Sequence, residues 1–544
     1  MFRNKSVDVH QFAMVPRADI PRSSFDIEFM HKTTMDSGYL VPFYVDEVLP
    51  GDTFRFNATM FARMATPIYP IMDNMYLDSF FFFVPNRLVW TNWVKMMGQQ
   101  DNPADSISYS TPQMVSAASG YAIGSLQDYF GLPTLGQVTA AMTVSHSALP
   151  LRAYNLIYNE WFRDENLQNS VVVDKGDAAS VYTDYSLLRR GKRRDYFTSA
   201  LPFAQKGSAV TMPLGTSAPV YGTGKTLGIT DGTTSMGMVG AVDGKVWTET
   251  AAYNTSVGSA EVSNQGTSKR YGVVTSGVSG LYADLSTATS ATINQIRQSF
   301  QIQRLLERDA RGGTRYTEQL TAHFGVTSPD SRLQRPEYLG GGSTPLNVNP
   351  IAQTGGTSAS GTTTPLGQLA GMATILAKGH GFTQSFVEHG IVIGLVSIRA
   401  DLTYQQGIRK FWNRLTKYDY YWPVFAHLGE QTILNREIYC KGDADPNDSA
   451  VFGYQERWAE YRYNPSMITG LFRSTAATTL DAWHLAQKFT ALPTLNTTFI
   501  QDTPPVARVV AVPSQPQFIF DCHCKNRVAR PMPMYSVPGL IDHF

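Results

Sequence analysis

The densest group of charged side chains in this sequence is a basic cluster that runs directly into two aromatic residues. The text LLRRGKRRDYF carries five cations and then Tyr196 and Phe197; the cations are Arg189, Arg190, Lys192, Arg193 and Arg194. Cationic side chains grip phosphates and aromatic rings stack on unpaired bases, the combination that single-stranded nucleic acid favours. The pattern therefore predicts a nucleic-acid contact. A solvated basic turn, or one paired with the carboxylates of a neighbour, is the structural interpretation of the same residues.

Two other short motifs have residue types that bind phosphate or metal, and both lack part of what that chemistry needs. In GTGKT, a phosphate-binding loop would require glycine five positions before Gly224, where the chain has Pro219. In Cys522-His523-Cys524 the cysteines are closer together than in structural zinc sites, and on a strand the histidine would face away from them. We expect neither a nucleotide site nor a metal site, and we interpret the two cysteines as packing residues.

The sequence offers no recognisable catalytic motif. It contains no nucleophile elbow of the type G-x-S-x-G, no H-E-x-x-H pair and no dinucleotide fingerprint after a strand. Glu388 and His389 are adjacent in an expected strand, so their side chains diverge. A pair of glycosidase carboxylates would escape notice, because sequence does not show how far apart carboxylates lie in space. We expect no enzyme activity and no cofactor.

The composition has the bias of a protein that buries much of its surface against other proteins. Charged residues make up 16% of the chain, against about 25% in ordinary soluble domains. Aromatic residues make up 12%, and 30 of the 45 basic residues are arginines. Interfaces are depleted of Lys and Glu and enriched in Tyr, Trp, Phe, Met and Arg. This bias favours extensive subunit contact, although a large, slightly apolar globular enzyme is an alternative.

Charge, cysteine content and apolar segments limit the remaining classes. With a net charge of +1, the chain lacks the positive field needed to condense nucleic acid by itself, so neutralisation of a genome must be local or delegated. The three cysteines are too few for a disulfide framework, which suits assembly in a reducing cytoplasm. The start MFRNKSVDVHQF has no apolar signal core, and the longest apolar clusters have the length of strands. We expect a soluble chain.

Strand patterns occur near both ends of the chain. Residues 39–64 give two strand-like runs around a Leu-Pro-Gly-Asp turn, and further runs follow in SFVEHGIVIGLVSIRADLTY and VARVVAVPSQPQFIFDCHC. Amphipathic helices are predicted after Pro150 and from about Thr292 to Gly312-Gly313. Sequence-distant strands separated by long excursions suit a Greek-key sandwich better than an alternating βαβ fold. The expected fold class is all-β dominated, with long insertions that carry several helices.

Two stretches rich in Gly, Ser and Thr, residues 207–290 and 340–367, interrupt this framework. Residues 207–290 have few charges and no helical stripe, but they contain β-formers between Gly-rich turns, so we favour a β-rich surface insertion over a disordered linker. Residues 525–544 carry three prolines, which deny backbone donors to a sheet and predict an extended C-terminal arm. An apolar arm of this kind would dock on a neighbouring subunit.

Residues 299–354, SFQIQRLLERDARGGTRYTEQLTAHFGVTSPDSRLQRPEYLGGGSTPLNVNPIAQT, resemble the gokushovirus branch of the microvirus major capsid proteins. The same resemblance holds for RADIPRSSFD near the start, for PVFAHLGEQ, FGYQERWAEYRY and DAWHLAQ in the later half, and for the final RPMPMYSVPGLIDHF. Nearly the whole chain is covered, and residues 207–290 are its least similar part.

The resemblance implies that residues 1–544 form a single capsid domain, an eight-stranded antiparallel viral jelly roll. Sixty copies would close a T=1 icosahedral shell around a circular single-stranded DNA genome, after assembly in the cytoplasm of the host bacterium. Residues 207–290 would form a protrusion at the three-fold axes that attaches to a host cell-surface receptor, and a separate small basic virion protein would accompany the DNA. The resemblance carries over no catalytic, metal-binding or cofactor-binding residue. The alternative function is a virion-associated β-sandwich polysaccharide depolymerase.

Overall fold

The computed structural model describes residues 21–210, 293–327, 334–354 and 367–535, together with the backbone of short strands between residues 220 and 283 and between 357 and 364. The chain divides into two compact units. The larger unit contains Met1–Ala204 and Asp309–Phe544, and the smaller unit is Gln205–Arg308.

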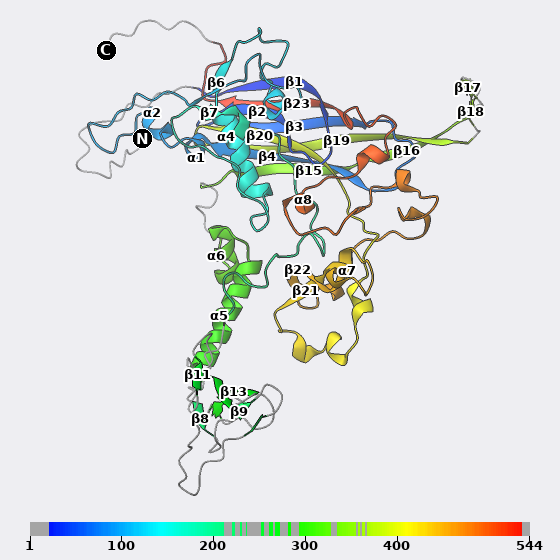
Figure 1. The fold of residues 1–544 in the computed structure, drawn as a ribbon. Helices are drawn as coiled ribbons and strands as arrows, with labels where there is room; N and C mark the ends of the chain where they lie inside the picture. The colour runs from blue at the N-terminus through cyan, green and yellow to red at the C-terminus, as the bar shows by residue number, and fades with distance from the viewer. Residues whose placement is uncertain are drawn as a thin grey trace. The chain divides into compact units, whose positions relative to one another are not determined.

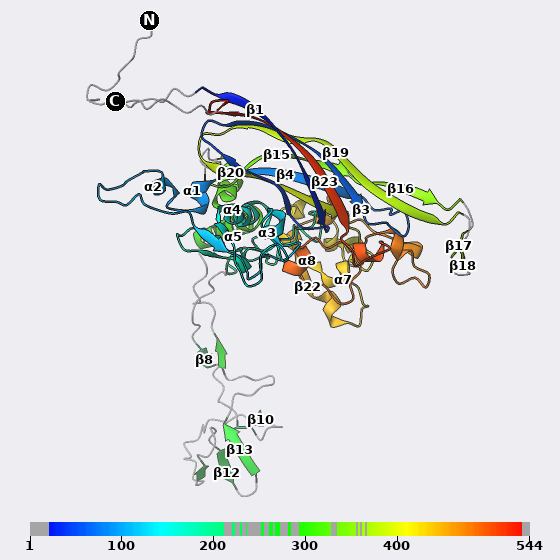
Figure 2. The ribbon, with the colours of Figure 1, turned by 90° about the horizontal axis from the view of Figure 1, so that it is seen from above.

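The larger unit is built on two antiparallel sheets (Figures 1 and 2). The order in the first sheet is β1-β23-β3-β19-β16, and in the second it is β15-β4-β20-β2. The first sheet consists of β1 (Ser23–Met35), β23 (Phe518–Arg530), β3 (Thr53–Met64), β19 (Leu369–Ser385) and β16 (Asn347–Ala352). The second sheet consists of β15 (Glu337–Pro345), β4 (Met75–Pro85), β20 (Gly390–Ala400) and β2 (Val41–Val48).

The order of these strands confirms the predicted jelly roll. Without β16, and counted along the chain, the first sheet has the order 1-8-3-6 and the second has the order 5-4-7-2, so that early and late strands lie side by side. This is the connectivity of a viral jelly roll of eight strands. The ninth strand, β16, lies at the edge of the first sheet and pairs with β19.

The two sheets differ in what covers them. Strand β3 alternates between buried and exposed residues, because one of its faces packs on the core and the other faces solvent. Strand β20 is buried along nearly its whole length. In β4, Phe81 and Phe83 pack into the core between the sheets, whereas Phe82 and Val84 pack into a second core on the opposite face. The second sheet is therefore apolar on both faces.

The second core is closed by the excursion between β4 and β15. Helix α4 (Leu149–Ile157), continued by a π-helical turn (Tyr158–Phe162), packs against β4 and β20, as Figure 1 shows. The predicted helix after Pro150 is thus confirmed as a packing helix. The other elements of this excursion in the larger unit are α1 (Asn86–Val89), α2 (Trp93–Met96), β5 (Gln113–Val115), α3 (Leu126–Tyr129), β6 (Ser145–Ser147), β7 (Ser180–Val181) and α6 (Tyr316–Phe324).

A second excursion, between β20 and β23, builds a third core. It contains β21 (Glu430–Leu434), α7 (Asn435–Ile438), β22 (Val451–Glu456) and α8 (Thr497–Ile500), connected by short 3-10 turns. Its apolar side chains pack around Tyr196 and Phe197 from the first excursion. The strands β17 (Thr357–Ala359) and β18 (Thr362–Thr364) form a separate hairpin between β16 and β19.

The smaller unit holds residues 207–290 and is described by residues 205–210, by its strands and by part of a helix. Short antiparallel strands pair in the orders β10-β9-β13-β12-β11 and β14-β8. Their bounds are β8 (Val220–Gly222), β9 (Ile229–Thr230), β10 (Ser235–Met236), β11 (Ala252–Asn254), β12 (Glu261–Asn264), β13 (Thr267–Tyr271) and β14 (Leu281–Ala283). The predicted helix near Thr292 is α5 (Ile293–Arg311), which runs past the end of this unit. The placement of residues 207–290 at a three-fold axis stays a prediction.

Two boundaries predicted from the sequence are wrong. Residues 525–530, assigned to the C-terminal arm, are the end of β23 and pair with both β1 and β3 inside the first sheet. The VARVVAV run, expected to be a strand, contains the 3-10 turn Val506–Arg508 instead, and the strand begins only at Phe518. Residues 536–544 of the predicted arm lie outside the described residues.

His380 is a buried polar side chain where β19, β4 and β15 meet. Its Nδ1 lies 2.7 Å from Ser79 Oγ, and its Nε2 lies 2.9 Å from Thr344 Oγ1. The ring packs over Gly342, where a Cβ atom would come within 2.7 Å of it. Burial lowers the pKa of His380 below its ordinary value of 6.5, and the charge of Asp78 only partly opposes this effect. The folded protein therefore favours the neutral imidazole.

We predict that His380 makes the fold sensitive to acid. Below pH 6.5 the histidine of the unfolded chain takes up a proton that the folded chain resists, so the free energy of unfolding falls until the lower folded pKa is reached. Well above pH 6.5 the histidine is neutral in both the folded and the unfolded chain, so it adds no pH dependence to the free energy of unfolding. Urea unfolding of the unaltered chain and of a His380→Gln variant measures the effect, and the variant should lose part of the pH slope. His523→Gln, at a partly exposed histidine, is the control, and equal slopes for all three chains would contradict the prediction.

Candidate functional site

The basic cluster predicted to contact nucleic acid contains an arginine that belongs to a buried ion network. Arg190 Nη1 lies 2.5 Å from Asp78 Oδ2, and Arg399 Nη2 lies 3.0 Å from the same oxygen. Burial works to raise the pKa of Asp78, but a hydrogen bond with Ser343 and the two arginine charges lower it overall. Burial also lowers the pKa of Arg190 to about 10, which still leaves the guanidinium charged at neutral pH. Arg190 is thus a counter-ion of the buried Asp78 on β4 and has a structural role.

Two further cations of the cluster lie over aromatic rings of the same chain. The guanidinium of Arg189 is 3.9 Å from the centre of the Tyr39 ring and donates a hydrogen bond of 3.1 Å to the carbonyl oxygen of Asp502. Lys192 Nζ lies 4.5 Å from the centre of the Phe499 ring. Burial lowers the pKa of Lys192 to about 8. Both side chains hold sequence-distant segments of the larger unit together.

The rest of the cluster divides into one paired residue and one exposed residue. Arg193 forms an ion pair of 3.1 Å with Asp401, whereas Arg194 is exposed. Tyr196 and Phe197 are only 3% and 2% exposed, so their rings are not available to stack on bases at the surface. Among the described residues the geometry favours the structural interpretation for four of the five cations, with partners from this chain. A nucleic-acid contact by the cluster stays a prediction.

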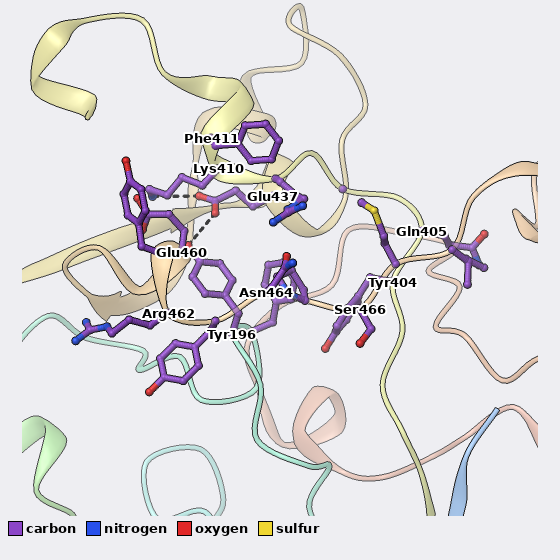
Figure 3. A pocket seen from close by; sticks show the side chains of 18 of the residues that line it. Tyr196, Tyr404, Gln405, Lys410, Phe411, Glu437, Glu460, Arg462, Asn464 and Ser466 are labelled. Carbon is purple, nitrogen blue, oxygen red and sulfur yellow. Dashed lines mark hydrogen bonds and ion pairs between the residues drawn. The ribbon is translucent and has the colours of Figure 1, made fainter. Parts of the chain in front are cut away.

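Tyr196 and Phe197 instead line a pocket of the larger unit, shown in Figure 3. The cavity has a volume of about 410 Å³, and its other walls come from residues 404–414, Glu437 and residues 460–473. The ring of Phe197 packs edge-on against Tyr196 and Tyr404, with centroid distances of 5.2 and 4.9 Å. The pocket is therefore assembled from three regions that are far apart in the sequence.

One wall of the pocket is built around the buried carboxylate of Glu437. Tyr196 Oη donates a hydrogen bond of 2.9 Å to Glu437 Oε2, and Lys410 Nζ lies 3.3 Å from Oε1. The backbone N–H of Leu434 donates to the same Oε1 at 3.0 Å. Burial raises the pKa of Glu437, although the Lys410 charge and these hydrogen bonds oppose the rise. Figure 3 shows Lys410, Glu437 and Tyr196 on one side of the pocket.

Both oxygens of the second carboxylate of the pocket, Glu460, also have partners from the chain. Arg414 Nη2 lies 3.1 Å from Glu460 Oε1, and Gln431 Nε2 donates a hydrogen bond of 2.6 Å to Oε2. Arg414 also donates to Tyr461 Oη at 2.6 Å. Every oxygen of Glu437 and Glu460 thus has a hydrogen-bond or ion-pair partner from the chain.

Besides Arg414, three arginines lie along the wall of the pocket that residues 404–414 and 460–473 form. Arg462 pairs with Glu456. The guanidinium of Arg409 lies 5.0 Å from the centre of the Phe411 ring, and Arg473 donates a hydrogen bond of 3.2 Å to the carbonyl oxygen of Gln405. Neither Arg409 nor Arg473 forms an ion pair with a carboxylate of the described residues. The pocket thus has surplus positive charge.

The remaining motifs take ordinary structural roles where the structure describes them. Cys522 and Cys524 are buried in the core between the sheets, and His523 lies on the opposite face of β23. Glu388 pairs with Arg87, whereas His389 packs against Trp93, so the two side chains diverge as predicted. Residues 223–226 of the GTGKT motif lie outside the described residues.

The described part of the chain offers neither a metal site nor a membrane-spanning helix. It contains no group of three or more His, Cys, Asp or Glu side chains placed to hold a metal ion. None of its helices has the length and apolar character needed to cross a bilayer.

The pocket was not predicted from the sequence. Its members Arg409, Lys410 and Arg414 are spread through RKFWNRL, and Tyr461 and Arg462 lie in EYRY, where they form no compact basic run. The signal that marks them is the combination of arginines with Tyr, Trp and Phe and few carboxylates, which is typical of interfaces. Partners such as Tyr196 and Glu437, 241 positions apart, meet only in the folded chain.

Comparison with known proteins identifies the family of the chain. A family model described as "Capsid protein (F protein)" matches residues 13–540. Capsid protein VP1 of Bdellovibrio phage phiMH2K is 47% identical, and capsid protein VP1 of Chlamydia phage 1 is 46% identical; each match covers 98% of both proteins. Capsid protein VP1 of Spiroplasma virus 4 is 34% identical, again over 98% of both. The chain therefore belongs to the microvirus major capsid proteins of the gokushovirus type and is a structural component of a bacteriophage virion.

Proposed function

We propose that the chain assembles as sixty copies into a closed T=1 icosahedral shell around a circular single-stranded DNA genome. The copies are held together largely by apolar and arginine-aromatic contacts, and each interface buries about 1,000 Å² or more. The observation that carries the proposal is a group of exposed apolar side chains on residues 411–428, which we name the aromatic loop.

The aromatic loop exposes more apolar surface than a monomer has reason to keep in water. Leu415 is 92% exposed, Val424 is 87% exposed and Trp412 is 72% exposed. The other large apolar or aromatic side chains that the loop exposes are Phe411, Tyr418, Tyr420, Tyr421, Trp422 and Leu428. Large exposed apolar patches mark interaction sites, because each Å² of apolar surface in water costs about 25 cal/mol. Leucine and valine do not stack on bases, so these side chains favour a protein partner.

The loop is held in shape although its surface is uncovered. The Asp419 carboxylate accepts hydrogen bonds from the backbone N–H groups of Leu415 and Thr416, at 3.0 and 2.7 Å. Trp422 Nε1 donates a hydrogen bond of 3.0 Å to the carbonyl oxygen of Lys417. A surface that is already ordered loses little conformational entropy on association. This order supports a preformed interface for a second copy of the chain.

In this proposal the genome and the host are contacted by parts of the virion other than the aromatic loop. The net charge of +1 and the internal pairing of most of the basic cluster leave neutralisation of the DNA to a small basic virion protein. Residues 207–290 form a protrusion at the three-fold axes that binds a host cell-surface receptor. The compactness of Gln205–Arg308 as a separate unit supports this assignment.

We predict that charge in the aromatic loop blocks assembly but not folding. Leu415→Asp and Val424→Asp should each reduce the yield of closed particles at least tenfold, because loss of an interface hot spot costs about 2 kcal/mol or more. Electron microscopy of the chain with its assembly partners gives the particle yield, and thermal unfolding checks the fold. Val387→Asp, at an exposed valine outside the loop, is the matched control. Normal particle yield from both loop variants would contradict the proposed interface.

Arg194 and Arg190 should respond differently to the same substitution. Arg194→Ser should lower the DNA content of particles without changing stability, because Arg194 is the exposed cation of the cluster. Arg190→Ser should destabilise the chain by roughly 3 kcal/mol, because Asp78 loses one of its two buried counter-ions. Particle absorbance spectra and urea unfolding measure the two effects. A normal DNA content in Arg194→Ser particles would assign the whole cluster to the structural interpretation.

Removal of residues 207–290 should separate attachment from folding. A chain in which a short linker replaces these residues should keep the jelly roll and its thermal unfolding transition, because the core of the larger unit uses none of them. Particles of this variant should lose adsorption to host cells, which is counted as unadsorbed particles after mixing. Unchanged adsorption together with a collapsed fold would show that the segment is core rather than appendage.

A further inference from the structure

Strand β1 lies at the edge of the first sheet and leaves one side of its backbone open. Among the described residues it pairs only with β23, and Figure 1 shows it as the outermost strand of that sheet. In an antiparallel pair, residues whose backbone groups bond the partner strand alternate with residues whose groups point away from it. The carbonyl oxygen of Thr34 accepts a hydrogen bond of 2.9 Å from Tyr129 Oη of α3, outside the sheet. The even-numbered residues of β1 therefore direct their backbone groups away from β23.

The pairing on the other side of β23 gives the same alternation. The backbone N–H of Ala65, directly after β3, donates a hydrogen bond of 2.7 Å to the carbonyl oxygen of Gln517, directly before β23. Odd-numbered residues of β23 thus bond β3, and its even-numbered residues bond the odd-numbered residues of β1 that lie opposite them. In the described part of the chain, no backbone group bonds the outward groups of residues 24–32. A long open edge of this kind is a template for another strand.

The core-facing side of β1 is also incompletely covered. Phe29 packs against the core between the sheets but is only partly buried, and Ile27 is 37% exposed. Phe25, His31 and Thr33 on the same side of the strand are partly exposed as well. A further strand beside β1 would cover these side chains and extend the core.

The outer side of β1 carries an apolar residue between two opposite charges. Met30 is 69% exposed, and Glu28 and Lys32 lie two positions before and after it on the same face. Within the chain, Glu28 pairs with Lys525 at 2.8 Å and Lys32 pairs with Asp521 at 2.6 Å. Charges of one sign along an edge would keep copies apart. Here the two signs stand at equal distances from Met30, so the strand is complementary to a second copy of itself that runs the other way.

We propose that β1 pairs with β1 of a second copy in antiparallel orientation across a two-fold axis, with Met30 opposite Met30. In this register Glu28 of each copy lies opposite Lys32 of the other, because a two-fold interface repeats every contact. The outward backbone groups of the two strands bond one another, and the first sheets of the two copies become one continuous sheet. The inference deepens the proposed function and rests on it, since an icosahedral shell has two-fold axes between its copies.

A cysteine at position 30 tests this register directly. Residues directly opposite in an antiparallel pair have Cα atoms about 5 Å apart, a distance that a disulfide spans. The full-length Met30→Cys chain is oxidised with diamide, both in particles made with its assembly partners and as the concentrated soluble chain, and dimers are counted on a non-reducing gel. The matched control is Ser24→Cys, at an exposed residue of the same strand that would lie opposite Asp36. The unaltered chain gives the contribution of Cys440, and thermal unfolding checks each fold.

Most of the Met30→Cys chain should become a disulfide-linked dimer, because each new thiol faces its own copy across the axis. The Ser24→Cys chain should stay at the level of the unaltered chain. A dimer fraction for Met30→Cys no higher than that of Ser24→Cys, in particles and in the soluble chain alike, would overturn the proposal.

Exchange of the two charges distinguishes contacts between copies from contacts within one chain. In the Met30→Cys chain, Glu28→Lys should lower the dimer fraction roughly fivefold, because like charges then lie directly opposite at two places in the interface. Adding Lys32→Glu should restore the dimer fraction to within about twofold, since opposite charges face each other again. Within each chain the exchanged residues lie beside the like charges of Lys525 and Asp521. A double variant that forms even less dimer than Glu28→Lys would contradict the register.

The same samples separate this inference from the proposed shell. If closed particles form but Met30→Cys gives no dimer in them or in solution, the strand pairing fails and the shell proposal stands. If the soluble Met30→Cys chain gives the dimer but no closed particles form from the unaltered chain and its partners, the shell proposal fails and the strand pairing stands.

Discussion

The second sheet of the jelly roll, β15-β4-β20-β2, is apolar on both faces, and neither face is stable in water. The first sheet covers one face, where Phe81 and Phe83 enter the core between the sheets. The other face, with Phe82 and Val84, needs a cover of its own, and helix α4 with its flanking segments provides it. The long excursion after β4 is therefore a third layer of the core, which the sandwich needs in order to fold.

The same sheet also carries the buried ion network of the larger unit. Asp78 is buried on β4 and needs counter-ions, which Arg190 and Arg399 supply. Because Arg190 is anchored in this way, the chain that follows it delivers Tyr196 and Phe197 to the third core and to the wall of the pocket. The basic cluster thus holds the excursion between β4 and β15 against the second sheet. It also places Tyr196 and Phe197 in the core of the excursion between β20 and β23. Residues 404–473 include exposed arginine and aromatic side chains that this chain does not cover by itself.

The framework of the fold was predictable because its signals are local. Alternation in β3 and continuous apolar runs in β4 and β20 identify strands directly, and their separation along the chain favours a Greek key over a βαβ fold. The fate of the basic cluster was not predictable, because Asp78, the partner of Arg190, lies 112 positions away. The pocket was not predictable either, because its residues, such as Tyr196 and Glu437, are 241 positions apart in the sequence. The arm was placed too early, because its prolines begin only at Pro531, and residues 525–530 are held in β23 by pairing with β1 and β3.

The central claim is that this chain acts by covering its exposed aromatic surface with copies of itself in a closed container. A near-atomic map of particles assembled from the chain and its partners tests that claim most directly. The account predicts sixty equivalent copies in which Trp412, Leu415 and Val424 are buried against a neighbouring subunit. Particles in which these three side chains face solvent on every copy would contradict it.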